Sequence, residues 1–80
     1  MSIQDNVFDA FYKSSFAVLR KHCGFESTAN LDMNIFKIGN NTHCVWTHAK
    51  DKIRYFVIFD KKKLSRLYKL DSNGKKTDII

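Results

Sequence analysis

The chain has 80 residues, a formal net charge of +6, 44% hydrophobic residues and 14% aromatic residues. This size fits one domain, residues 1–80, and such a composition excludes a disordered chain. The longest apolar run, Tyr55–Phe59, is much too short to cross a membrane, and Asp5 and Asp9 interrupt any secretory signal. With only two cysteines, we expect a cytoplasmic protein with free thiols and no membrane partner.

The N-terminal segment predicts an amphipathic helix over residues 3–22. Apolar side chains recur three and four positions apart, which places them on one face of a helix. We expect Phe8, Phe11, Val18 and Leu19 to pack against a sheet. Gly24 follows as a stop, and residues 25–31 form a connector.

Beyond the connector, apolar and polar residues alternate with the period of two that is typical of β-strands. The turn signals Gly39-Asn40-Asn41 and Ser72-Asn73-Gly74 indicate hairpins. The predicted fold is therefore α+β, with one N-terminal amphipathic helix packed on a four- to five-stranded antiparallel β-meander. The expected strands are at about 33–38, 43–49, 52–59, 64–70 and 75–80.

Two features of this sheet remain open. Residues 61–70 fit a helix through Leu64, Leu67 and Tyr68, but three consecutive lysines would crowd the positive end of the helix dipole, which favours a strand. The second open feature is which face of the sheet the helix covers. We expect the helix to cover Ile35, Val45, Val57 and Leu67 and to leave the face near Trp46 and Tyr55 partly open.

Charge is strongly segregated along the sequence. Residues 1–49 hold four basic and four acidic side chains, whereas residues 50–80 hold ten basic and four acidic ones. A basic sheet surface attracts phosphates, and aromatic side chains stack on bases where they are exposed. The candidate residues for binding nucleic acid or an acidic partner are Lys50, Lys52, Arg54, Lys61, Lys62, Lys63, Arg66, Lys69, Lys75 and Lys76, with Trp46, Tyr55 and Tyr68.

The candidates for catalysis or metal binding are weaker. His43 and His48 could serve acid–base chemistry in RNA cleavage, but their opposite strand parity predicts that they face opposite sides of a sheet. A zinc site built from Cys23, Cys44 and His48 lacks the paired spacing of zinc ligands. We therefore expect no metal and no cofactor.

The leading hypothesis is a small non-enzymatic binding or regulatory protein that uses a basic sheet surface to engage nucleic acid or an acidic protein. Its small size and lysine-rich composition would suit a product of a phage or other mobile element. The alternatives are a small endoribonuclease toxin of a toxin–antitoxin system, or a homodimeric interaction protein without a polyanion ligand. The sequence shows no resemblance to a known family.

Overall fold

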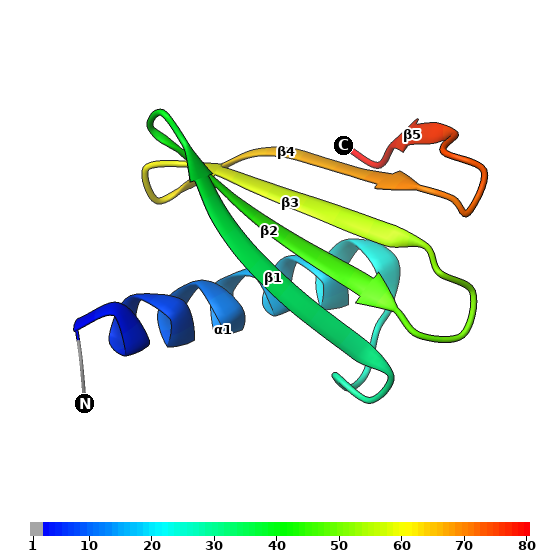
Figure 1. Cartoon of the computed structure of the whole chain (residues 1–80), viewed down its shortest axis with the longest axis horizontal. Coiled ribbons are helices and arrows are strands. Elements are labelled where there is room, and N and C mark those ends of the chain that lie inside the picture. The colour runs from blue at the N-terminus through cyan, green and yellow to red at the C-terminus, as the bar shows by residue number, and fades with distance from the viewer. Residues whose placement is uncertain (1–2) are drawn as a thin grey trace.

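The computed structural model describes residues 3–80 of the chain, and side chains from residue 7 onward. One helix precedes a five-stranded sheet in which each strand pairs antiparallel with the next, in the order β1-β2-β3-β4-β5 (Figure 1). This arrangement confirms the predicted α+β meander. The elements are α1 (Ile3–Cys23), β1 (Leu31–Ile38), β2 (Asn41–His48), β3 (Arg54–Asp60), β4 (Lys63–Leu70) and β5 (Lys76–Asp78).

The open question over residues 61–70 is settled in favour of a strand. The pairing of β3 with β4 shifts between Ile58 and Phe59, so that Ile58 pairs with Arg66 while Phe59 pairs with Leu64. One residue of β4, Ser65, is therefore left over as a bulge. The bulge puts Leu64 on the same face as Leu67, three residues later. A spacing of three, which suggested a helix, is here the signature of an irregular strand.

Two hairpin turns meet at one end of the sheet. Gly39 and Asn40 connect β1 to β2, and Lys61 and Lys62 connect β3 to β4. Gly39 and Lys61 each occupy the first turn position with a positive φ of 60°, which glycine adopts easily and lysine does not. The backbone N–H of Lys61 donates a hydrogen bond to the carbonyl oxygen of Asn40 over 3.3 Å, which holds the two turns side by side.

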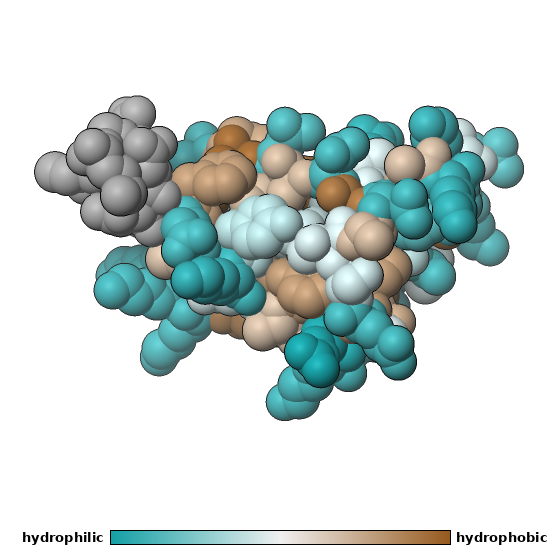
Figure 2. Space-filling view, turned by 90° about the horizontal axis from the view of Figure 1, so that it is seen from below, coloured by the Kyte–Doolittle hydropathy of each residue, from teal (hydrophilic) through white to brown (hydrophobic). Residues whose placement is uncertain are grey.

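The core lies between α1 and one face of the sheet. Leu19 of α1 and Val57 of β3 are completely buried, and Leu67 of β4 is almost so. The helical stripe differs slightly from the expected one, because Val7 and Phe8 remain about half exposed. Figure 2 shows hydrophobic surface among the hydrophilic side chains, which fits a domain too small to cover all of its apolar residues.

Trp46 is the centre of this core, which corrects the expected orientation of β2. The predicted inward residue, Val45, lies on the opposite face, and Trp46 is 0% exposed instead. The rings of Tyr12 and Phe16 lie 5.0 and 5.6 Å from the Trp46 ring. Trp46 Nε1 donates a hydrogen bond of 2.9 Å to Ser15 Oγ, so the one polar atom of the indole is satisfied. Burying the largest side chain outweighs burying valine.

The other face of the sheet is not covered by the helix (Figure 1). We call it the open face. Strand pairing arranges it in rows, one of which runs Phe36, His43, Ile58, Arg66 from β1 to β4. Ile58 is only 3% exposed on this face, because the side chains around it shield it. The open face therefore has buried apolar side chains between larger aromatic and cationic ones.

Candidate functional site

Four lysines gather where the two hairpin turns meet, and we call this group the lysine corner. It consists of Lys61 and Lys62 in the β3–β4 turn, Lys63 at the start of β4, and Lys37 near the end of β1. Lys37, Lys61 and Lys62 line a depression of about 250 Å³ that is also bordered by Phe11, Asn40 and Thr42. None of the four forms an ion pair with another described side chain. Strand pairing places Lys37 on the helix side of the sheet and Lys63 on the opposite face, so the cluster of positive charge extends round the end of the sheet.

Lys37 is the member of this corner that the sequence analysis missed. It lies 24 positions before Lys61 in a charge-balanced half of the chain, so a charge count along the sequence gave it no weight. The available signal was topological. In a meander, the first and third hairpin turns lie at the same end of the sheet, so a lysine beside the first turn approaches the lysines of the third.

The open face carries a second group of cations, which is held against aromatic rings. Phe56 and Tyr68 stack with centroids 4.7 Å apart and planes 7° apart. The Cζ atom of Arg54 lies 5.8 Å from the Phe56 centroid, while Arg66 Cζ and Lys76 Nζ lie 4.9 and 4.7 Å from the Tyr68 centroid. The three cations thus lie over aromatic rings of the open face, and Lys76 also forms an ion pair with Asp78 at 3.8 Å.

A second aromatic pair occupies the open face nearer the lysine corner. Phe36 of β1 stacks on His43 of β2 with centroids 5.0 Å apart and planes 13° apart. Phe36 is 45% exposed, since β1 is an edge strand with no neighbour beyond it. Neither ring takes part in a cation–π contact with a described residue. Phe36 therefore leaves much of its side chain open to solvent at the edge of the sheet.

The remaining predicted cations lie elsewhere. Lys50 and Lys52 belong to the β2–β3 turn and Lys75 to the β4–β5 turn, at the end of the sheet away from the lysine corner. Lys69 pairs with Tyr55 in the ladder and so faces the helix side. The single basic surface expected from the sequence is thus divided, because strand alternation and successive turns send neighbouring lysines in different directions.

Two of the three predicted stacking residues are not on the open face. Trp46 is fully buried beneath α1, so its ring cannot reach a base. Tyr55 lies on the same side and meets the ring of Phe25 edge-on, with centroids 5.1 Å apart. Burial is the main cause that raises the pKa of Tyr55, and the nearby Asp51 and Cys23 raise it further. Of the predicted three, Tyr68 alone lies on the open face.

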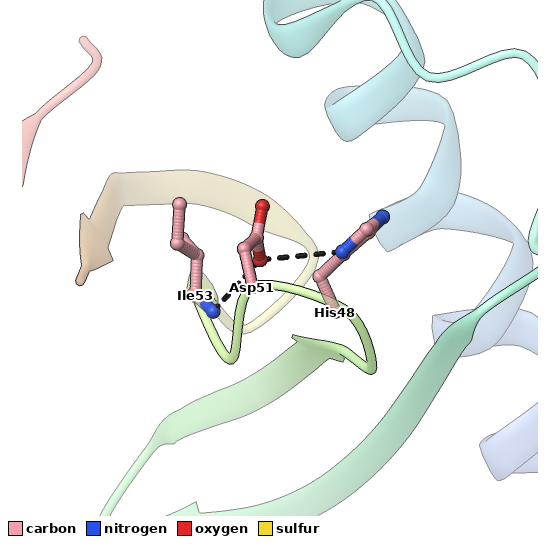
Figure 3. Close-up of polar contacts among 3 residues, drawn as sticks. All are labelled: His48, Asp51 and Ile53. Atoms are coloured by element: carbon pink, nitrogen blue, oxygen red, sulfur yellow. Dashed lines mark hydrogen bonds and ion pairs between the residues drawn. The ribbon is translucent and has the colours of Figure 1, made fainter. Parts of the chain in front are cut away.

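The two histidines considered for catalysis, His43 and His48, lie on opposite faces of the sheet. His43 belongs to the open face, whereas His48 is on the helix side and contacts the ring of Phe25. The Nδ1 atom of His48 is 3.2 Å from Asp51 Oδ1, which accepts a hydrogen bond of 3.0 Å from the backbone N–H of Ile53 (Figure 3). His48 Nδ1 is buried and makes no hydrogen bond with a described residue, so Asp51 Oδ1 is hydrogen-bonded only to the backbone N–H of Ile53 within the β2–β3 turn. The histidines form no joint acid–base site.

The cysteines are free thiols, as the sequence analysis predicted, and burial makes them poor nucleophiles. Burial raises the pKa of Cys44 to about 11, although a hydrogen bond with Ser15 lowers it in part. Burial also raises the pKa of Cys23, with nearby Lys69 opposing the change. Thiols with raised pKa values stay protonated at neutral pH, and the thiolate is the reactive form. Within residues 7–80, whose side chains the structure describes, no three His, Cys, Asp or Glu side chains converge to suit a metal ion.

Comparison with known proteins adds no assignment: no family model, curated protein or solved structure matches the chain. Helix α1, the one helix in the described residues, does not combine the length and hydropathy needed to cross a bilayer. The surface features that bear on function are therefore the lysine corner and the cations and aromatic rings of the open face.

Proposed function

We propose that this protein binds nucleic acid through the lysine corner and the adjoining open face, as a small binding or regulatory protein. The observation that carries the proposal is that Lys37, Lys61 and Lys62 line one depression, with Lys63 next to them along the chain. Clustered lysines bind phosphates by point-charge attraction and release the counterions condensed on the nucleic acid. The two free thiols support a reducing compartment such as the cytoplasm.

Charge balance supports phosphate as the ligand chemistry. Asp60 is the acidic side chain next to the corner in sequence, so four lysines and one aspartate leave a local charge of about +3. An acidic protein would satisfy the same charge. However, the open face adds aromatic rings and arginines, which suit nucleic acid better than carboxylates alone.

Salt dependence of binding tests the proposal. If all four lysines neutralise phosphates, the logarithm of the association constant should fall against the logarithm of salt with a slope of about −3 to −4. Fluorescence anisotropy of a labelled oligonucleotide, titrated between about 50 and 200 mM salt, measures this slope. Undetectable binding to DNA and RNA at the lowest salt would refute the proposal and leave an acidic protein as the candidate partner.

A charge-matched pair of variants separates the corner from general attraction. The triple variant Lys61→Gln, Lys62→Gln, Lys63→Gln should weaken binding and make the slope shallower by about 2 to 3 units. The control, Lys50→Gln, Lys52→Gln, Lys75→Gln, removes the same charge at the opposite end of the sheet. Each triple also contains one residue with positive φ, Lys61 or Lys52. Equal losses in both variants would show that net charge, and not the corner, determines binding.

A further inference from the structure

The open face next to the lysine corner has the features of a stacking platform for unpaired bases. The two aromatic pairs on this face differ in what covers them. Phe56 and Tyr68 have cations placed over their rings, so the pair is already covered on its outer sides. Phe36 has His43 against one ring face, belongs to the edge strand β1 and is 45% exposed.

We propose that Phe36 stacks on an unpaired base, so that the ligand is single-stranded nucleic acid. This inference rests on the proposed function, since it specifies the form of nucleic acid that the same surface binds. A base inside a duplex has both faces covered by its neighbours, whereas an unpaired base is free to stack on an exposed ring. Phe36 is 45% exposed, and its ring lies 13° from parallel to that of His43. A base that stacks on Phe36 would therefore add a third ring to an existing stack.

Cations that could bind the phosphates lie on β4, across the open face from Phe36. Arg66 ends the row that begins with Phe36, and Lys63 ends the adjacent row that begins with Ile38. Three strand spacings separate Phe36 from Arg66, or about 14 Å. Arg66 rests on Tyr68, which leaves the edge of its guanidinium free to donate hydrogen bonds. The strand therefore lies across the open face, with a base at β1 and phosphates towards Arg66 and Lys63 of β4. Lys37 lies in the row of Thr42 and Phe59, on the helix side of the sheet, and is not part of this path.

The strand form of the ligand gives the first measurement. The probes are a labelled oligothymidylate and a hairpin duplex with the same number of phosphates, and the readout is the dissociation constant by anisotropy at fixed salt. We expect the single strand to bind more tightly, and inorganic polyphosphate to compete less well than unlabelled single strand at equal charge.

Substitutions at the edge strand give the second measurement. Phe36→Ala should weaken single-strand binding about 5- to 150-fold, the range for losing one base–aromatic stack, with duplex binding unchanged. Phe36→Tyr should retain binding. The control is Ile38→Ala, which removes an apolar side chain that is 59% exposed on the same strand and face but carries no ring.

The outcomes separate this inference from the proposed function. Equal binding of single strand and duplex, with Phe36→Ala no worse than Ile38→Ala, overturns the stacking inference. The lysine corner is still upheld in that case if the Lys61, Lys62, Lys63 triple variant weakens binding more than its control. Competition by polyphosphate as strong as that by single strand also overturns it. Loss of all nucleic-acid binding at low salt overturns the proposed function and the inference together.

Discussion

The hydrogen bond between Trp46 and Ser15 is the sharpest test of how the helix is fixed to the sheet. Both side chains are 0% exposed, and Trp46 Nε1 lies 2.9 Å from Ser15 Oγ. Ser15→Ala removes the acceptor and leaves the indole N–H buried without a partner, which costs about 1–3 kcal/mol. Alanine recovers about 0.5 kcal/mol of helix propensity. The net loss in free energy of unfolding is therefore about 0.5–2.5 kcal/mol.

A double-mutant cycle with Trp46→Phe isolates the interaction itself. Trp46→Phe removes the donor, while Ser15 Oγ still bonds to the Tyr12 carbonyl oxygen at 3.3 Å. In the double variant neither group is left unpaired by the other, so the two losses should be less than additive by about 1 kcal/mol. Urea unfolding followed by far-ultraviolet circular dichroism measures each variant, because Trp46 is the sole tryptophan and its fluorescence is lost in two of them.

Ser14→Ala provides the matched control. Ser14 is the exposed neighbour of Ser15 on the same helix, so the substitution makes the same chemical change without touching the core. We expect it to leave stability within about 0.5 kcal/mol of the native protein. The reasoning fails if Ser15→Ala behaves like Ser14→Ala, or if the cycle gives a coupling energy of zero.

Three further measurements test the core and one turn. Burial raises the pKa of Cys44 from 9.0 to about 11, so the protonated thiol stabilises the folded state below pH 9 and this contribution is lost as the pH rises from about 9 through 11. Over this range the free energy of unfolding from thermal melts should fall by up to about 2 kcal/mol more for the native protein than for Cys44→Ala. Parallel curves for the two proteins would contradict this. Lys61→Gly should raise the free energy of unfolding in urea by about 0.5–1 kcal/mol, because glycine adopts the positive φ of this position without strain. Lys62→Gly should give no such gain. A loss of stability in both variants would show that Lys61 is unstrained. Leu67→Ala, at a position 1% exposed, should cost about 2–5 kcal/mol by the same assay and Leu64→Ala less, and the reverse order would contradict the described core.

The sequence predicted the elements well because hydrophobic periodicity reports local structure directly. It predicted the inward face of β2 wrongly, because Val45 and Trp46 are both apolar and neighbouring positions of a central strand are both buried. Alternation cannot choose a face when both faces are apolar. The deciding signal was Ser15, a small polar residue within the apolar stripe of α1, which marks where the indole N–H must bind.

The site was predicted less completely than the fold because charge was counted along the chain and not across strands. Lys61, Lys62 and Lys63 do cluster, since one turn holds them. Lys69 lies only six residues later, yet it faces the helix side, while Lys37 joins the cluster through the β1–β2 turn. Contacts between residues distant in sequence depend on strand order and register, which a single sequence does not specify.

The meander order of the sheet also has a consequence for how the protein folds. Every strand pairs with the strand next to it along the chain, so the sheet can grow by successive hairpins, each closing a short loop. The bond between Ser15 and Trp46 spans 31 positions and belongs to the docking of α1. Low contact order of this kind is associated with rapid folding. We therefore expect the hairpins to nucleate the native structure and the helix to seal it afterwards.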